Sequence, residues 1–365
     1  MWYPAPVPRW QALHDNWKQL IMADRGPTAL LWVGSEGVGK TPIALAFIQA
    51  RLCEEGKGLY ACGQCYACRT MEKLQTPQLF LIPPLPTNPS CPLEDGVEWL
   101  RRALIANPFL TLAYWEEEVI RSLQDKSAGT KREKKNARRK GEYPISVEVV
   151  RQVQDWLKLK PTAQEWRVVL FWHAEQLTRQ AANALLKIVE EPPAHTMFMF
   201  LATHREALPA TLRSRCQTWY FPPLSPTELE QLSGTKLSDE EIILAEGSYA
   251  KLRALREESQ QKYLRALRTW IEALHPQTPW RSEVEEAIEI LSQHPYLSDW
   301  LIMGVRLARK IGTNPSFNAL IADRLLHIAD AVDANISPTG LLWEVTLELR
   351  QSRGLGEFRW EWLHS

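Results

Sequence analysis

A glycine-rich stretch near the N-terminus has the residue types that bind phosphate groups. The sequence GSEGVGKT lies between an apolar run, ALLWV, and a segment with helical periodicity, PIALAFIQA. Glycines let a loop backbone approach phosphate oxygens, and the free N–H groups of a following helix favour an anion. A lysine and a hydroxyl residue after the last glycine suit the phosphates and Mg²⁺. These residues predict a P-loop whose ligand class is ATP or ADP with Mg²⁺, held by Gly34, Gly37, Gly39, Lys40 and Thr41.

The acidic residues that P-loop hydrolases use are missing from the expected place. Such enzymes hold Mg²⁺ with an aspartate, often beside a glutamate that positions water. Here the apolar run RVVLFW leads directly into HAEQL, so Trp172 and His173 stand where acids are expected. An indole cannot ligate Mg²⁺, and histidine is a poor substitute for a carboxylate that orients water. We expect hydrolysis in this pocket to be very slow or absent.

Four cysteines close together in the sequence have metal-binding chemistry. Their spacing is CxxxxxxxxCxxCxxC, and the last three lie in the segment GKGLYACGQCYAC. Four thiolates can enclose a structural Zn²⁺ ion tetrahedrally, with no open position for catalysis. A redox role would need only one CxxC pair and would leave the first cysteine unexplained. The sequence therefore predicts a structural zinc site formed by Cys53, Cys62, Cys65 and Cys68.

The elements that must position these residues alternate in type as far as about residue 223. Helical patterns separate five continuous apolar runs, which are typical of parallel strands covered on both faces. We predict an α/β sandwich with ligands beyond the carboxyl ends of its strands. After PPLSP (222–226) the strand patterns stop and amphipathic helical patterns follow. The apolar runs are 29–33, 78–84, 167–172, 196–203 and 217–223.

A long segment, about 86–144, interrupts this alternation between the second and third apolar runs. It contains a helical, aromatic piece (VEWLRRALIANPFLTLAYWEEEVIRSL) and then a polar, basic run that includes residues 131–140. The basic run is either a solvated surface or an electrostatic contact with nucleic-acid phosphates. The sequence leaves both roles open.

Bulk composition limits the class of protein. The chain has 365 residues, a formal net charge of +0 and 45% hydrophobic residues, all ordinary for a globular protein. No apolar run approaches the roughly 20 residues that a membrane span needs. The start, MWYPAPVPRWQ, lacks the layout of a secretory signal. We expect a cytoplasmic protein with no membrane partner, in which clustered cysteines bind metal more often than they form disulfides.

On these motifs the chain resembles the AAA+ clamp-loader subunits of bacterial DNA polymerase III, and among them the delta-prime type. The resemblance is carried by the cysteine cluster after the P-loop, by the block AANALLKIVEEPPAHTMFMFLATHREALPATLRSRCQ (181–217), and by WYPAPVPRWQ and TPQLFLIPP. It covers the N-terminal domain apart from the insertion, and the C-terminal helices only in pattern. Members of this family form an open pentamer that loads the sliding clamp onto primed DNA.

The resemblance implies a fold, partners and domain boundaries. The fold would be an α/β AAA+ P-loop domain (1–223), a small helical lid domain (224–261) and an all-α collar domain for oligomerisation (262–365). The partners would be gamma/tau and delta subunits, with the sliding clamp and primer-template DNA reached through the complex.

Two further residue roles follow from the resemblance. In this family an arginine of an SRC motif completes the ATP site of the neighbouring subunit. The SRC motif is at 214–216, so Arg215 is expected to stabilise phosphoryl charge in trans. A local ion pair is the alternative role for Arg215. Thr203 matches the sensor-1 position, whereas the sensor-2 arginine is replaced by Ala250.

The missing acids and the lost sensor 2 favour a non-hydrolysing stator of the delta-prime kind. The alternative is a gamma/tau-type ATPase motor that uses Glu175 as its acidic residue. A small-molecule kinase would need a set of lid arginines that the sequence does not supply. ATP turnover by the isolated protein separates the stator from the motor.

Overall fold

The structure is a computed structural model, and it falls into two compact units. The first unit is Met1–Lys236 with Gly247–Ala250, and the second is Leu237–Glu246 with Lys251–Ser365. The division into three domains that the sequence suggests stays a prediction. The described residues are 27–55, 61–87, 91–126, 143–159, 165–275, 278–294, 297–311, 315–334 and 336–351.

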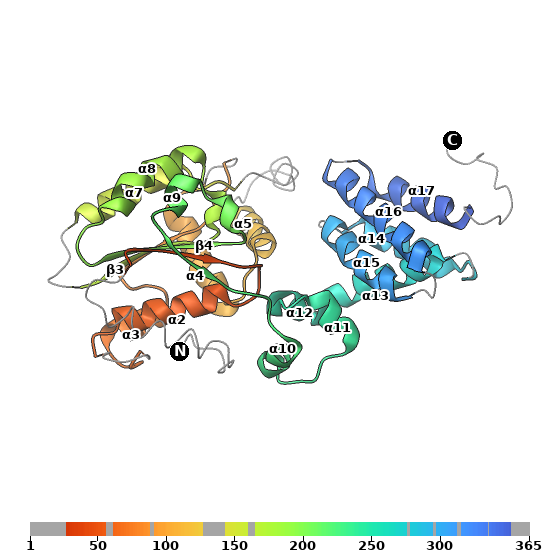
Figure 1. The fold of residues 1–365 in the computed structure, drawn as a ribbon, viewed down its shortest axis with the longest axis horizontal. Helices are drawn as coiled ribbons and strands as arrows, with labels where there is room; N and C mark the ends of the chain where they lie inside the picture. Colours follow the sequence, from red (N-terminus) through yellow and green to blue (C-terminus); the bar gives the residue numbers. More distant parts are fainter. Residues whose placement is uncertain are drawn as a thin grey trace. The chain divides into compact units, whose positions relative to one another are not determined.

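Five strands form one parallel sheet in the first unit (Figure 1). Their order across the sheet is β2-β3-β4-β1-β5, and each neighbouring pair is parallel. Strands β1, β3 and β4 are buried along their whole length, which explains their continuous apolar sequences. The predicted parallel sheet between helices is confirmed. The strands are β1 (Ala29–Val33), β2 (Leu79–Ile82), β3 (Arg167–Phe171), β4 (Thr196–Ala202) and β5 (Gln217–Tyr220).

Helices cover both faces of this sheet. In Figure 1, α2 (Lys40–Leu52) and α3 (Tyr66–Glu72) lie on one face, and α7 (Val147–Lys158) and α8 (Arg179–Glu190) on the other. Helix α8 begins where the Thr178 side chain accepts a hydrogen bond from an N–H of the first turn. The short helices α9 (Ala210–Arg213) and α10 (Pro226–Ser233) complete the unit, together with two helices of the insertion.

The insertion expected at about 86–144 contains two amphipathic helices. They are α4 (Leu93–Ala106) and α5 (Leu112–Lys126), and they pack against each other. Trp99 and Leu100 of α4 are buried, as are Trp115 and Val119 of α5. The basic run at 131–140 lies outside the described residues, so its role stays a prediction.

Every described element after β5 is a helix. In the second unit, Trp270 is fully buried in an apolar core, and its Nε1 donates a hydrogen bond of 2.8 Å to Thr346 Oγ1. Helix α12 (Tyr249–Arg256) begins in the first unit and ends in the second. The helices of the second unit are α11 (Asp239–Ala245), α13 (Glu258–Leu274), α14 (Ser282–Ser292), α15 (Leu297–Ile311), α16 (Pro315–Asp333) and α17 (Pro338–Gln351).

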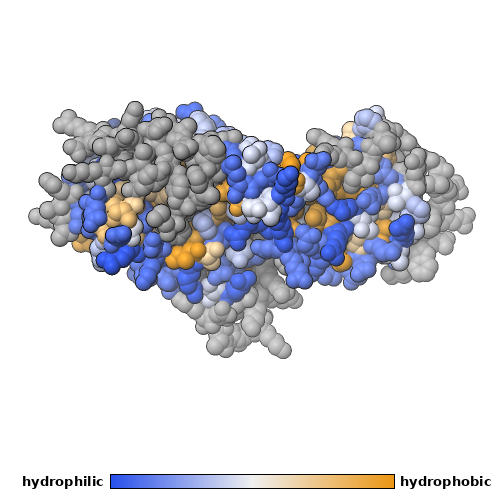
Figure 2. All heavy atoms as spheres, turned by 90° about the horizontal axis from the view of Figure 1, so that it is seen from below, coloured by the Kyte–Doolittle hydropathy of each residue, from blue (hydrophilic) through white to orange (hydrophobic). Residues whose placement is uncertain are grey.

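The apolar residues are mainly inside the two units. On the face drawn in Figure 2, the coloured residues are mostly hydrophilic, and hydrophobic residues show in small groups. Among the described residues, no helix is both long enough and apolar enough to cross a bilayer. The apolar cores therefore hold the sheet and the helices together.

Candidate functional site

The glycine-rich loop follows β1 and leads into α2. The N–H of Gly34 donates to the carbonyl oxygen of Ala202, at the end of the neighbouring strand β4. A Cβ at Gly34 would lie only 2.3 Å from the carbonyl oxygen of Phe221, so no other residue fits there without movement. Gly37 and Gly39 have φ values of 73° and 100°, in the left-handed region that glycine adopts without strain. The backbone shape therefore depends on the three predicted glycines.

Lys40 and Thr41 begin α2, and both are buried to the same extent, with 8% of their surface exposed. The Lys40 ammonium turns back onto the loop and donates to the carbonyl oxygens of Gly34 and Ser35, the latter at 2.8 Å. Burial lowers the pKa of Lys40 to about 8, although the nearby Glu175 and Glu36 carboxylates oppose this shift. The cation that the sequence assigns to phosphates is thus bonded to its own loop.

The end of β3 places an indole against the first turn of α2. Trp172 is 1% exposed, and its Nε1 donates a hydrogen bond of 3.2 Å to Thr41 Oγ1. The hydroxyl that a P-loop hydrolase offers to Mg²⁺ is therefore engaged by a tryptophan. The sequence has a tryptophan where an acid is expected, and the structure places that tryptophan against Thr41.

A histidine between two carboxylates follows this tryptophan. His173 has a left-handed φ of 57°, and its Nδ1 lies 3.0 Å from Glu175 Oε1. Its Nε2 lies 3.5 Å from Glu36 Oε1, across the pocket. Burial raises the pKa of Glu175, but the hydrogen bond and charge of His173 outweigh this and lower it overall. Glu175 is thus an ionised carboxylate whose near partner is a histidine.

A pocket with about 350 Å³ of empty space, its open mouth included, lies beside these residues. It brings together Gly37, Gly39, Lys40, Thr41 and Thr203 of the predicted nucleotide-binding set, while Gly34 shapes the loop from outside. Thr203 follows β4, and its Oγ1 lies 2.9 Å from His204 Nδ1. The opposite wall is Pro108, Phe109 and Leu110, from the turn between α4 and α5.

This opposite wall and the role of Glu36 are what the sequence did not indicate. The wall comes from the insertion, far from the P-loop in sequence, and its residues match no nucleotide-binding motif. The available signal was the apolar periodicity of the insertion, which predicts that its helices pack on something but does not say on what.

Arg215 lies away from this pocket, between α9 and β5. Its Nε and Nη2 donate to Glu190 Oε2 at 3.2 and 2.9 Å, and its Nη1 donates to the Thr211 carbonyl oxygen at 2.8 Å. The local ion pair that the sequence left open is therefore present. The side chains of Arg215 and Glu190 are 31% and 58% exposed, and ion pairs at such sites are worth about 0–1 kcal/mol. Separating the Arg215 guanidinium from Glu190 therefore costs little free energy.

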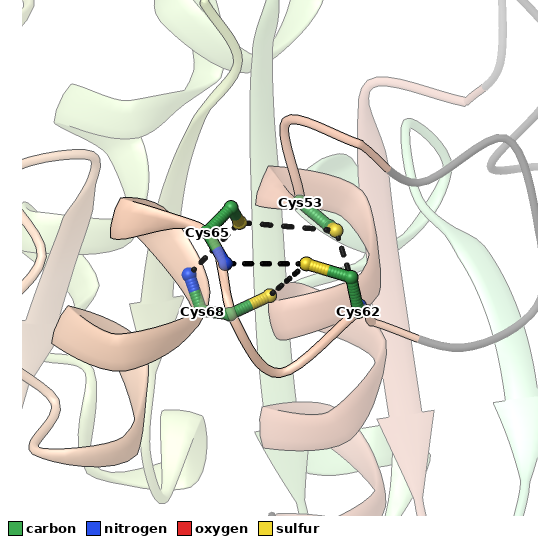
Figure 3. Close-up of side chains that lie close together, drawn as sticks. All are labelled: Cys53, Cys62, Cys65 and Cys68. Carbon is green, nitrogen blue, oxygen red and sulfur yellow. Dashed lines mark hydrogen bonds between the residues drawn. The ribbon is translucent and has the colours of Figure 1, made fainter.

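The four clustered cysteines converge in space. Figure 3 shows their sulfur atoms turned toward one another, and these atoms all lie within 4.8 Å. Tetrahedral ligation at metal–sulfur distances of about 2.3 Å fits sulfur spacings of roughly 4 Å. Backbone N–H groups of Cys62 and Cys65 donate to sulfurs of the cluster at 3.3 Å. Burial raises the pKa values of Cys53 and Cys68; it acts in the same direction at Cys65, but hydrogen-bond donors lower the pKa of that thiol overall to about 7. The convergence of the four sulfur atoms is what allows this donor set to hold a metal ion.

Comparison with known proteins gives one family. The family model described as "DNA polymerase III, delta subunit" matches residues 10–225. DNA polymerase III subunit delta' of Yersinia pestis is 30% identical over 225 residues, which are 60% of this chain and 48% of that protein. The delta' subunit of Escherichia coli K12 is 28% identical over 252 residues, which are 69% of this chain and 57% of that protein.

Subunits with another name are similar as well. The tau/gamma subunit of DNA polymerase III from Haemophilus influenzae is 26% identical over 224 residues, which are 61% of this chain and 24% of that protein. The chain thus spans about half the length of the delta' relatives and about a quarter of the tau/gamma relative. The likeness extends to both kinds of subunit.

Proposed function

This chain belongs to the clamp-loader family described as DNA polymerase III, delta subunit, and on that premise we propose that it is a non-hydrolysing stator. As part of a bacterial replicative clamp loader, it would assist in loading the sliding clamp onto primed DNA. Its neighbours would be gamma/tau and delta subunits, in agreement with relatives named delta' and tau/gamma. The hydrogen bond between Trp172 and Thr41 is the observation that carries the proposal.

In the proposed stator, the chain's own pocket would lack what ATP hydrolysis requires. Hydrolysis needs a cation held between the phosphates and carboxylate or hydroxyl ligands, and a base or a positioned water. The Thr41 hydroxyl is bonded to an indole, and Trp172 replaces the usual carboxylate. ATP or ADP is the ligand class to which the loop's shape corresponds, with Gly34, Gly37, Gly39, Lys40, Thr41 and Thr203 as the binding residues. Any such ligand that entered the pocket would not be turned over.

The catalytic contribution of this chain would be Arg215, acting on the nucleotide of a neighbouring gamma/tau subunit. A guanidinium that is supplied from outside a site stabilises the charge of the transferring phosphoryl group. Two observations support this role: Arg215 lies outside its own chain's pocket, and its partly exposed ion pair with Glu190 can exchange for another anion. Glu190 would hold the side chain extended until a neighbour's phosphates replace the carboxylate.

The metal of the cysteine cluster would be Zn²⁺ in a structural role. Four sulfur ligands leave no position for a substrate, and thiolate ligands favour zinc among common cytoplasmic metals. The cluster is tied to the P-loop helix, because Gln49 of α2 donates to the Cys68 carbonyl oxygen at 3.1 Å. The site would fix α3 against α2. We also place the protein in the cytoplasm, with a lid domain (224–261) and a C-terminal collar (262–365) as its further domains.

A second function, an ATP-hydrolysing motor of the gamma/tau type, is favoured by one observation. Glu175 lines the same pocket as Lys40, and its lowered pKa keeps the carboxylate ionised. In a motor this carboxylate would take over the part of the missing acid. The near hydrogen-bond partner of this carboxylate is His173 Nδ1, at 3.0 Å.

Turnover of ATP by the isolated protein distinguishes the two functions. The stator releases no phosphate above the background of a Lys40→Ala control over long incubation. The motor releases phosphate at a rate that Glu175→Gln abolishes, with Glu165→Gln, on the same chain but outside the pocket, as the matched control. Sustained turnover that depends on Glu175 would exclude the stator.

A further inference from the structure

The turn between α4 and α5 forms one wall of the P-loop pocket. Pro108, Phe109 and Leu110 lie opposite the phosphate-binding residues. Phe109 and Leu110 line the pocket but are only 7% and 3% exposed, so their apolar side chains pack mostly against other residues. The roughly 350 Å³ of empty space beside these residues includes open solvent at the mouth of the pocket. The turn of the insertion thus lines the pocket together with the glycine-rich loop.

Three contacts fix this turn in place. The N–H of Leu112, at the start of α5, donates to Glu36 Oε1 of the glycine-rich loop at 3.0 Å. A carboxylate at this position satisfies a free N–H and complements the helix dipole. The Phe109 ring lies against the ring of Tyr249, with centroids 4.7 Å apart. Within the turn, the Asn107 side chain accepts a hydrogen bond from the Phe109 N–H at 3.2 Å.

The first turns of α5 contact the same indole, that of Trp172, which bonds the Thr41 hydroxyl. Trp115 is fully buried, and its Nε1 donates to the Pro84 carbonyl oxygen at 2.9 Å. Its ring meets the ring of Trp172 edge to face, with centroids 5.9 Å apart. The insertion thus supports Trp172 from one side, while Thr41 accepts the indole N–H on the other.

Inside the pocket, the polar groups that a nucleotide would use already have partners within the chain. The Lys40 ammonium bonds two loop carbonyls, the Thr41 hydroxyl accepts from Trp172, and Glu36 accepts from Leu112. A Mg²⁺-nucleotide bound through Lys40 and Thr41 would have to replace their contacts within the chain, and the Glu36 carboxylate, an anion in the same pocket, repels phosphate.

From these contacts we propose that the α4–α5 turn, residues 107–111, is a built-in plug that keeps Mg²⁺-nucleotide out of the P-loop pocket. The proposal rests on the proposed function only in taking the glycine-rich loop for a nucleotide-binding one. A nucleotide binds only when the plug is displaced, so its apparent affinity falls in proportion to the open fraction of the protein. A pocket that is open about 1% of the time binds about 100-fold more weakly than an open one.

Two variants of the full-length chain open the plug in different ways. Phe109→Ala combined with Leu110→Ser removes the apolar side chains with which the turn lines the pocket. Leu112→Pro removes the N–H that bonds Glu36, and proline suits the first position of a helix, so α5 keeps its start. Ile105→Ala, on α4 but 49% exposed and outside the pocket, is the matched control.

The measurement is the dissociation constant of a fluorescent ATP analogue with Mg²⁺, with folding checked by circular dichroism and a thermal melt. Each opening variant is expected to bind at least about tenfold more tightly than the wild type, and Ile105→Ala like the wild type. Wild-type binding as tight as that of the opened variants overturns the plug, and so do folded variants that gain no affinity. Micromolar binding by the wild type overturns it whether or not a variant folds.

This assay is separate from the tests of the proposed function. It does not involve Arg215, so a failure of the plug leaves the trans role of that residue standing. A failure of the stator would show instead as ATP turnover by the isolated wild-type chain, which the binding measurement neither requires nor reports.

Discussion

The indole nitrogen of Trp172 donates a hydrogen bond of 3.2 Å to the hydroxyl of Thr41, and both side chains are buried. In a P-loop hydrolase that hydroxyl would be a ligand of Mg²⁺. Here the Thr41 hydroxyl accepts a hydrogen bond inside the protein core. The residue types of a P-loop are present, and the hydroxyl that the motif assigns to Mg²⁺ has an indole as its hydrogen-bond partner.

Thr41→Val is therefore expected to affect stability and not catalysis. The change leaves a buried Trp172 N–H without its acceptor, which should lower the free energy of unfolding by about 1–3 kcal/mol. The reconstituted loader should hydrolyse ATP at the wild-type rate. Trp172→Phe removes the donor, so in a double-mutant cycle the paired change should cost less than the two single changes added together. A loss of loader ATPase activity with Thr41→Val would mean that the hydroxyl ligates a metal.

Arg215→Ala should affect ATP hydrolysis by the loader and hardly affect stability. The isolated chain should lose at most about 1 kcal/mol of stability, because the ion pair with Glu190 is partly exposed. Arginines that act in trans are worth about 10³–10⁵ in the turnover of the site that they complete. The reconstituted loader should therefore lose most of the activity of one site. Arg205→Ala, an exposed arginine earlier in the same segment, is the control and should leave the rate unchanged.

The sheet and the loop could be predicted because short-range chemistry determines them. Continuous apolar runs mark the strands of the sheet, and all five lie where they were expected. The edge strand β5 is an exception to the expected burial, because its residues are exposed or half-buried. Gly37 and Gly39 have positive φ values, and the P-loop motif predicts this because it has glycine at both positions. The convergence of Cys53 with the other three cysteines could be predicted in the same way, because metal ligands have characteristic spacings.

The contact between the insertion and the pocket could not be predicted, for a physical reason. Its central hydrogen bond joins the Glu36 carboxylate to the backbone N–H of Leu112, and every residue except proline has such an N–H. In the sequence, Phe109 and Leu110 are ordinary apolar residues between two helical segments. Which surface they cover depends on how α4 and α5 pack on the sheet, and single-sequence periodicity does not contain that information.

Removal of the metal should destabilise the first unit. The purified protein is expected to contain about one equivalent of zinc per chain, and a strong chelator should release it together with four reactive thiols. The thermal melt should shift down, because α3 and its loop lose their anchor on α2. Cys68→Ser should reproduce this effect, while Cys91→Ser, outside the cluster, should not. Zinc-free protein with a chelator-insensitive melt would contradict the structural metal.

The buried Lys40 ammonium makes stability depend on alkaline pH. Its pKa falls from 10.5 to about 8 on folding, so the folded state holds this proton less tightly than the unfolded chain. Below pH 8 both states are protonated and the destabilisation is present in full. Between pH 8 and 10.5 the unfolded chain binds more protons, so the free energy of unfolding rises with pH, by at most about 3 kcal/mol.

Comparison of variants isolates this effect from other groups that titrate in the same range. Urea denaturation at a series of pH values from 7 to 10.5 should show the wild type gaining stability relative to Lys40→Met as the pH rises. Lys73→Met, which removes an exposed lysine after α3, should follow the wild type in parallel. A pH-independent difference between the wild type and Lys40→Met would mean that the ammonium is solvated, and that the glycine-rich loop is open where the structure has it closed.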